Sequence, residues 1–188
     1  MVRPTHTLIL NGQYESGPSP GSLDQPAAPA RGHSWLRRPG IVSIAAVRGH
    51  AIGAGFQLAL SCDLRVFCDD AKVCMKEPAL GLVPDLTGTK PLVDIVGLPR
   101  ALEMCLTART VDAGEARELG LAELVVPAAR LDDAVADLTA ALLATDAATT
   151  RAVKELLSLA PRNTLEEQSA AERRAQAELQ RERLGPLD

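Results

Sequence analysis

A short apolar run, Ile41–Val47, is rich in β-branched residues and predicts a buried strand. Polar and glycine residues at positions 48–50 interrupt this run. A second apolar run, Phe56–Leu60, predicts a helix, and the small residues Gly53-Ala54-Gly55 stand directly before it. The pattern therefore predicts a glycine-rich turn that leads from a buried strand into a helix.

This predicted turn has the chemistry of an anion site. Glycines allow a ligand to approach the backbone closely. The first N–H groups of a helix have no partner within the helix and lie at the positive end of its dipole, so they suit an anion or a developing oxyanion. A lone Gly-x-Gly also occurs where small residues serve packing alone, so both interpretations stay open on these residues by themselves.

Short strands and helices alternate after the turn. The expected segments are strands over 64–67 and 72–75, a loop over 82–89, helices over 90–96 and 101–108, and a strand over 124–126. Asp112 and Glu115 form a capping box for one more helix, which Gly120 ends.

The last third of the chain predicts three amphipathic helices. The first covers residues 131–144, with apolar residues at helical spacing, and the second covers 148–159. Thr164 caps the third, which runs to about Leu184 and carries a face rich in Glu and Arg.

The N-terminal segment differs in character from the rest. Thr7–Leu10 could form a short strand, but the following residues are dense in Pro, Gly, Ser and Ala and predict loop or disorder. We therefore expect three parts, namely an irregular segment 1–38, a core 39–145 and a helical region 146–188.

Composition narrows the class of protein. The net charge of the 188 residues is −4, which gives no electrostatic footprint for nucleic acid. No apolar run approaches membrane-spanning length, and the first residues lack the features of a signal peptide, so a cytoplasmic protein is expected. The cysteines match no common zinc spacing, and we expect no metal site and reduced, buried thiols at these positions: Cys62, Cys68, Cys74 and Cys105.

Three blocks of sequence resemble the crotonase, or enoyl-CoA hydratase/isomerase, superfamily. The first block lies within residues 39–63 and includes Ile44-Ala45-Ala46-Val47 and Ala51-x-Gly53-x-Gly55. The second contains Glu77, Leu80-Gly81-Leu82-x-Pro84 and Gly88-Thr89, and the third spans residues 106–121. The order and spacing of the blocks are specific, and together they cover most of the chain. The resemblance implies an α/β fold, namely a crotonase-like spiral of ββα units with C-terminal helices and an incomplete N-terminal portion.

The resemblance also implies a reaction and the residues that perform it. Family members bind an acyl-coenzyme A thioester, with no further cofactor, and two backbone N–H groups polarise its carbonyl to stabilise an enolate. One of these donors matches Ala54, and the acid/base carboxylate matches Glu77. The remaining positions that the resemblance brings to the substrate are Gly53, Gly55, His50, Pro84, Asp85 and Gly88.

This chain departs from the family pattern at two places. Hydratases of the family use two glutamates, but Gln57 occupies the first position. An amide orients water but does not accept a proton at neutral pH, so isomerase-like chemistry with a single carboxylate is favoured over hydration. Gln57 is then expected to line the site as a polar residue. The segment before Ile41 is much shorter than in the family, and Pro18 and Pro20 lie near the place of the other N–H donor, although proline has no N–H.

Alternatives to an active enzyme therefore remain. The chain could be an inactive, truncated or degenerate family member that acts as a binding or assembly subunit. A serine peptidase of the related spiral fold is disfavoured, because no serine lies within Gly53–Gln57. The resemblance implies a homotrimer or hexamer, with the helical region 146–188 at its interface. Nucleic acid is not expected as a partner because the net charge is negative, and a membrane is not expected because no apolar run is long enough.

Overall fold

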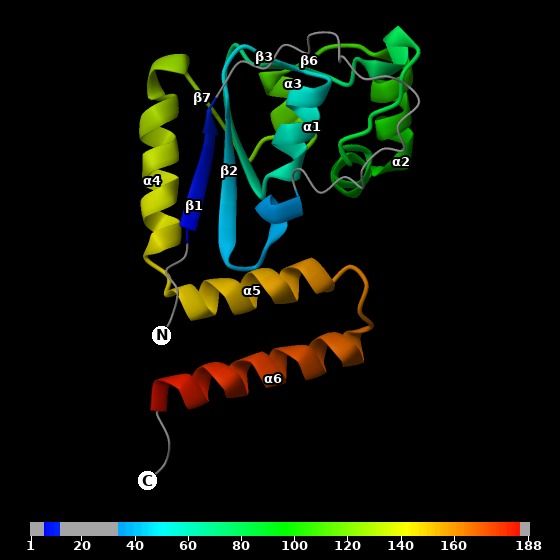
Figure 1. The fold of residues 1–188 in the computed structure, drawn as a ribbon. Helices are drawn as coiled ribbons and strands as arrows, with labels where there is room; N and C mark the ends of the chain where they lie inside the picture. The colour runs from blue at the N-terminus through cyan, green and yellow to red at the C-terminus, as the bar shows by residue number, and fades with distance from the viewer. Residues whose placement is uncertain (1–5, 12–33, 185–188) are drawn as a thin grey trace, which may run out of the picture.

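A four-stranded parallel sheet forms the centre of the computed structural model, which describes residues 6–11 and 34–184 (Figure 1). Its strand order is β1 (His6–Asn11), β2 (Ile41–Val47), β4 (Leu64–Cys68) and β7 (Leu124–Val126). The predicted strand over Ile41–Val47 is confirmed, and the short N-terminal strand is confirmed and extended by one residue at each end. Parallel strands need cover on both faces, which explains why β2 is apolar almost throughout.

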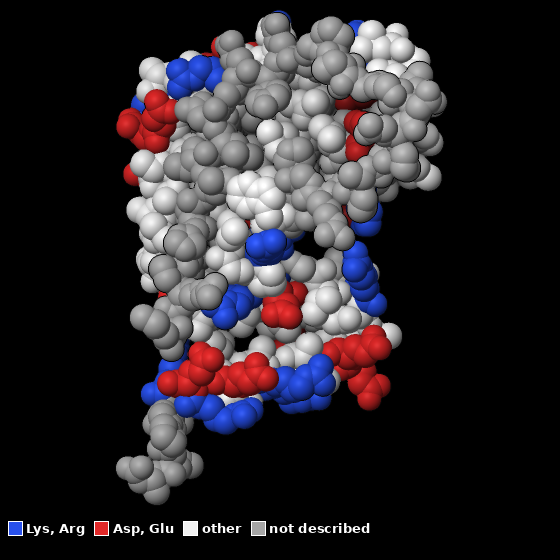
Figure 2. Space-filling view, in the orientation of Figure 1, with Lys and Arg blue, Asp and Glu red and all other residues white. Residues whose placement is uncertain are grey.

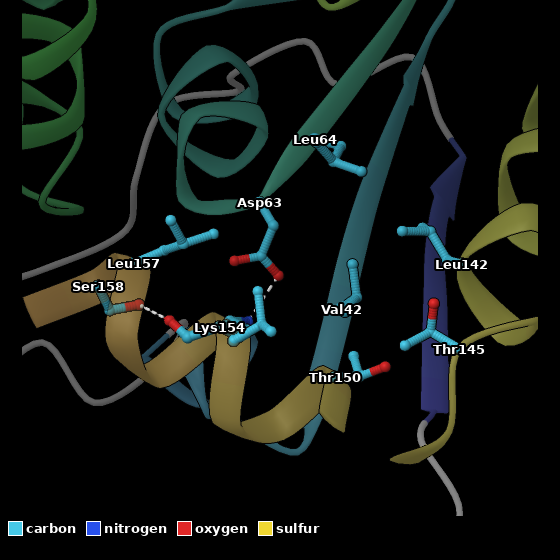
Figure 3. A pocket seen from close by; sticks show the side chains of 10 residues that line it. Val42, Asp63, Leu64, Leu142, Thr145, Thr150, Lys154, Leu157 and Ser158 are labelled. Carbon is cyan, nitrogen blue, oxygen red and sulfur yellow. Dashed lines mark hydrogen bonds and ion pairs between the residues drawn. The ribbon is translucent and has the colours of Figure 1, made fainter. Parts of the chain in front are cut away.

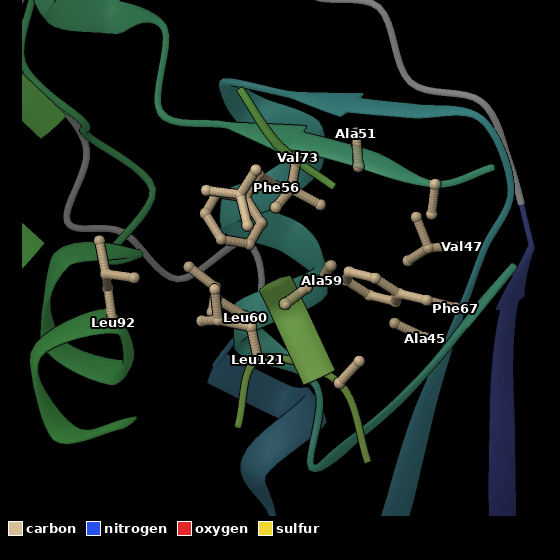
Figure 4. Close-up of a cluster of buried hydrophobic side chains, with 14 of the residues drawn as sticks. Ala45, Val47, Ala51, Phe56, Ala59, Leu60, Phe67, Val73, Leu92 and Leu121 are labelled. Carbon is tan, nitrogen blue, oxygen red and sulfur yellow. The ribbon is translucent and has the colours of Figure 1, made fainter. Parts of the chain in front are cut away.

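Alternate residues of β2 and β4 face two separate hydrophobic clusters. Ala45 and Val47 pack with Phe67 in the larger cluster, on the side of α1 (Ala54–Ser61) (Figure 4). Ile44 and Ala46 pack on the opposite face against α4 (Leu131–Leu143). The period of two along each strand thus places helices on both sides of the sheet.

A second sheet of three strands lies beside the first. It contains β3 (His50–Ile52), β5 (Lys72–Cys74) and β6 (Val111–Asp112), with β3 parallel and β6 antiparallel to β5. The chain runs β2–β3–α1 and then β4–β5–α2, so each unit places one strand in each sheet before its helix. This repeat is the spiral of ββα units that the sequence predicts, and the α/β fold class is confirmed.

The prediction that residues 48–50 only interrupt the chain was wrong in one respect. His50 begins β3 and pairs with Lys72. His50 therefore lies in a strand of the second sheet, and its side chain is exposed. Three residues are too few to show a strand pattern, and this strand exists because of pairing with β5.

The helices of the core follow the predicted segments. The two helices expected over 90–96 and 101–108 are confirmed. They are the two halves of α2 (Thr89–Thr107), which meet at a kink where Gly97 adopts the non-helical angles φ 74° and ψ 160° before Pro99. The capping box is confirmed, because the Asp112 carboxylate accepts a hydrogen bond from the Glu115 N–H at 2.9 Å at the start of α3 (Ala113–Glu118). Three short 3₁₀ turns complete the core: η1 (Ser34–Arg37), η2 (Glu77–Leu80) and η3 (Ala128–Arg130).

The predicted C-terminal helices are confirmed as α4, α5 (Ala147–Leu159) and α6 (Leu165–Leu184). Figure 1 shows α5 and α6 side by side beyond the end of the central sheet. Lys154 attaches α5 to the core, because its Nζ donates to the Asp63 carboxylate at 2.7 Å and to the Ile41 carbonyl at 2.5 Å. Asp63 therefore has a structural role, since it also accepts from the Ser43 N–H at 2.8 Å.

The charged side chains on the surface are of both signs, and the cysteines are free thiols. Lys, Arg, Asp and Glu side chains alternate over α6, and Figure 2 shows no patch of a single sign on this face. Within residues 6–11 and 34–184, no helix is long and apolar enough to span a membrane. All four cysteines are free thiols, and three of them are buried, whereas Cys105 is half-buried.

Candidate functional site

A strained glycine turn starts α1. Gly53 adopts φ 54° and ψ −116°, a conformation that side chains disfavour, and its N–H donates to the Cys74 carbonyl at 2.8 Å. The Gln57 N–H closes the first helical turn on the Gly53 carbonyl at 2.9 Å. The N–H groups of Ala54, Gly55 and Phe56 precede this bond, so the helix offers them no acceptor. The helix therefore gives the Ala54 N–H no acceptor of its own, and the anion-binding role of Ala54 stays a prediction.

Pairing between β3 and β5 brings the second block of sequence to the same place. Ile52 pairs with Cys74, so the segments that follow these two strands leave the sheet side by side. Gln57 and Glu77 meet there, and the Gln57 Nε2 donates to the Glu77 Oε1 at 2.7 Å. Ala54 precedes Gln57 by three residues, about 4.5 Å along the helix axis at 1.5 Å per residue.

The two oxygens of the Glu77 carboxylate differ in their hydrogen bonding. Oε1 accepts the bond from Gln57, whereas Oε2 is buried and has no hydrogen-bond partner in the described part of the chain. A buried, unpaired carboxylate oxygen is costly unless a ligand or water meets it, so it is a marker of function. The negative charge of Glu77 also adds to the effect of burial in raising the pKa of the Cys105 thiol, which lies on α2.

The Gln57 side chain is fully buried, and its amide is bonded at both ends. Its Oε1 accepts hydrogen bonds from two backbone groups of the loop before α2, the Leu86 N–H at 2.9 Å and the Gly88 N–H at 3.3 Å. A methyl group on Gly88 would lie 2.6 Å from the Gln57 Cγ and 2.9 Å from its Cβ. The loop therefore lies directly against the Gln57 side chain.

The other residues predicted to bind substrate differ in their exposure. Gly55 is buried in the first turn of α1, Pro84 is half-buried, and the side chains of Asp85 and His50 are exposed. Gly88 contacts Gln57 directly, because its N–H donates to the Gln57 Oε1. The structure thus brings together Gly53, Ala54, Gln57, Glu77 and Gly88.

Sequence reasoning missed two features of this neighbourhood. The Leu86 N–H is a backbone donor, which no residue type reveals. Thr87 adopts φ 67°, an uncommon conformation for a β-branched residue, and the sequence carries no sign of it. The predictions at Pro18 and Pro20 lie outside the described residues.

A separate cavity of about 590 Å³ lies between the central sheet and α5 (Figure 3). Its wall includes Val42, Leu64, Leu142 and Leu157, and the Lys154–Asp63 ion pair closes one side. The cavity shares no lining residue with the Gln57–Glu77 site. It is a feature of how α5 sits on the sheet rather than part of that site.

Comparison with known proteins gives a consistent family. The family model described as enoyl-CoA hydratase/isomerase matches residues 31–184. The chain is 37% identical over 131 residues to the probable enoyl-CoA hydratase echA8 of Mycobacterium leprae, which covers 70% of this chain and 51% of that protein. It is 45% identical over 101 residues to the enoyl-CoA isomerase/hydratase claC of Penicillium crustosum, which covers 54% of this chain and 12% of that protein.

A solved structure is more similar still. The candidate enoyl-CoA hydratase of Thermobifida fusca superposes with a TM-score of 0.81 and 65% identity, over 81% of this chain and 59% of that one. Structures of that protein also exist in complex with CoA and with acetoacetyl-CoA. The chain spans about half the length of the mycobacterial relative and 59% of the T. fusca protein. On the family match, and on a fold and sequence shared with these proteins, the chain belongs to the enoyl-CoA hydratase/isomerase family, within the crotonase superfamily.

Proposed function

We propose that the protein binds an acyl-CoA thioester and catalyses an isomerase-like proton transfer through a stabilised enolate. The observation that carries this proposal is the Glu77 carboxylate: Gln57 donates to Oε1, and Oε2 is buried with no hydrogen-bond partner among the residues that the structure describes. The CoA and acetoacetyl-CoA complexes of the T. fusca protein, at 65% identity, support the ligand class.

The reaction needs one base and one oxyanion donor from these residues. The Ala54 N–H donates to the thioester carbonyl oxygen, which gains negative charge when Glu77 removes a proton from C2 of a 3-enoyl thioester. Glu77 then returns that proton to C4, so the double bond moves to C2–C3 and no atom is gained or lost. A single carboxylate completes this cycle because it accepts and donates the same proton.

Hydration is disfavoured by the other side chain in contact with Glu77. Gln57 cannot act as a second base at neutral pH, and both ends of its amide are already bonded. Addition of water across a double bond by two carboxylates therefore lacks its second member. The reaction favoured at this site keeps all of its atoms within the substrate.

Titration with acetoacetyl-CoA tests the oxyanion site directly. A saturating near-ultraviolet band of the bound enolate is expected, because the enolate is stabilised only where N–H donors meet the carbonyl oxygen. If the folded protein gives no band, the enzyme proposal fails, and the alternative of a catalytically inactive binding or assembly subunit takes its place.

A matched pair of proline variants then tests Ala54. Ala54→Pro removes the N–H at the first position of a helix, where proline is tolerated. Loss of one oxyanion donor should lower kcat/KM for isomerisation by about 10²–10³-fold. Ala147→Pro makes the same change at the first position of α5, outside the site, and should leave kcat/KM unchanged. Equal activities of the two variants would refute the role of Ala54.

The same proposal includes self-association into a trimer or hexamer. Support comes from α5, none of whose residues is fully buried in the single chain, and from α6, which packs mainly on α5. Equilibrium sedimentation measures the mass directly. A monomer at micromolar concentration would refute this part of the proposal and leave the chemistry untouched.

A further inference from the structure

We propose that Gln57 is a positioning residue that locks the Leu86–Gly88 loop onto α1 and turns Glu77 so that Oε2 is its proton-transferring oxygen. The kinetic part of this inference rests on the proposed function. The structural part concerns the contacts of this chain alone.

The orientation of the Gln57 amide follows from its partners. Two backbone N–H groups, of Leu86 and Gly88, face one atom of the amide. Only a carbonyl oxygen can accept from both, so the NH₂ group must point the other way, toward Glu77. That group donates to the Glu77 Oε1 at 2.7 Å, which leaves Oε2 as the carboxylate oxygen without a hydrogen-bond partner among residues 6–11 and 34–184.

The loop depends on the same amide. The N–H groups of residues 86 and 88 converge on one oxygen, and Thr87 between them adopts a left-handed backbone with φ 67°. Such a pair of converging N–H groups forms a small concave site for an oxygen. A β-branched residue in this conformation is strained, so the loop needs contacts that hold it there. The Gln57 oxygen supplies two of them.

Gln57 thus couples three segments that are far apart in sequence. The amide belongs to α1, its acceptor Glu77 begins η2, and its donors belong to the loop that leads into α2. If the amide were lost, both the loop and the carboxylate would lose a fixed partner at the same time. A residue that only filled space would not link these two effects.

Two substitutions at this position separate the two functions of the amide. Gln57→Met keeps the length and apolar stem but removes the acceptor and the donor. Gln57→Glu keeps an acceptor for Leu86 and Gly88, and in its ionised form it replaces the donor to Glu77 by a second carboxylate. Gln168→Met is the matched control, because it makes the same change at a half-buried glutamine between α5 and α6, outside the site.

Amide hydrogen exchange over residues 84–90 measures the loop and needs no activity. In Gln57→Met, exchange at Leu86 and Gly88 should be about tenfold faster than in the unsubstituted protein, because this variant loses the oxygen that accepts from both N–H groups. In Gln57→Glu and Gln168→Met, exchange at these two residues should stay within about twofold of the unsubstituted protein. Unchanged exchange in Gln57→Met would overturn the loop assignment. If that variant fails to fold, faster exchange in Gln57→Glu would overturn it instead.

Kinetics and a crystal structure measure the carboxylate. In Gln57→Glu, kcat for isomerisation should fall about tenfold or more while KM changes less than about twofold, because the loss affects proton transfer rather than thioester binding. The Glu77 carboxylate should also leave its position in a crystal structure of Gln57→Glu. Unchanged kcat, or an unmoved carboxylate, would overturn the orienting role. If the unsubstituted protein shows neither turnover nor an enolate band, the proposed function fails, whereas the exchange and the crystal structure still decide this inference.

Discussion

Replacement of Gly88 by alanine is the sharpest test of how the site is packed. The added methyl carbon would lie 2.6 Å from the Gln57 Cγ, 2.9 Å from its Cβ and 3.1 Å from its Cα. The backbone of Gly88 has φ −65° and ψ −24°, which alanine adopts without strain. The substitution therefore isolates a steric clash from any conformational penalty.

The clash cannot be relieved by a small side-chain movement. Gln57 is fully buried in α1, and its amide is bonded to Glu77, Leu86 and Gly88. Either the loop moves away and the Gly88 N–H bond is lost, or the Gln57 side chain leaves its partners. Overpacking of this kind costs about 1–3 kcal/mol of the free energy of unfolding. At roughly 2–4 °C per kcal/mol for a domain of this size, the midpoint of thermal unfolding should fall by about 2–12 °C.

Chemical and thermal unfolding of Gly88→Ala against Gly40→Ala provides the measurement. Gly40 has no atom within 4 Å of the position of an added methyl carbon, so its substitution should be neutral or stabilise by about 0.4–1 kcal/mol. Gly88→Ala should also lower the rate of any isomerisation, because it displaces Gln57. Equal stabilities of the two variants, within about 0.5 kcal/mol, would refute the close packing of the loop on Gln57.

Three further outcomes follow from the structure. Glu77→Gln should abolish turnover while acetoacetyl-CoA still binds, and retained turnover would remove Glu77 from the mechanism. Lys154→Met leaves the half-buried Asp63 without its cation and should lower the free energy of unfolding by about 1–3 kcal/mol. The control Lys90→Met, at an exposed ion pair, should change the free energy of unfolding by less than about 0.5 kcal/mol. Similar losses in the two variants would contradict the attachment of α5 by Lys154. Burial raises the pKa of the Cys62 thiol from 9.0 to about 11, so this thiol ionises in the unfolded chain at a lower pH than in the folded protein. The free energy of unfolding, measured by urea titration, should therefore decline by on the order of 2–3 kcal/mol between pH 9 and 11. The same decline in Cys62→Ala would contradict this cause.

Local sequence patterns were sufficient to predict most of the helices and strands. The β-branched run Ile41–Val47 and the glycines before α1 are strong, short-range signals, and the structure has the strand and the turn where the pattern places them. Asp112 and Thr164 act as caps through contacts with residues three positions ahead, which the sequence displays directly. Strand β3 was missed because three residues carry no periodicity and its existence depends on pairing with β5, twenty-two residues further on.

The site was only partly predictable, for a different physical reason. Resemblance to a family selected Ala54, Gln57 and Glu77, but no spacing rule says that the last two touch. Their contact depends on β3 and β5 pairing in register, a property of the folded sheet. The role of Lys154 could not be predicted from the sequence for the same reason, because its partners are a carboxylate and two carbonyls that only folding brings together.

The backbone donors show why side-chain motifs describe this site incompletely. The groups that hold the Gln57 oxygen are N–H groups, and those proposed to hold the thioester oxygen are also N–H groups, which every residue except proline possesses. What distinguishes them is geometry: a glycine turn at Gly53, a left-handed Thr87 and a glycine at position 88 that admits Gln57. Substitutions that keep residue chemistry but alter this geometry, such as Gly88→Ala, should therefore damage the site as much as the loss of a polar side chain. A site that depended on side-chain chemistry alone would tolerate them.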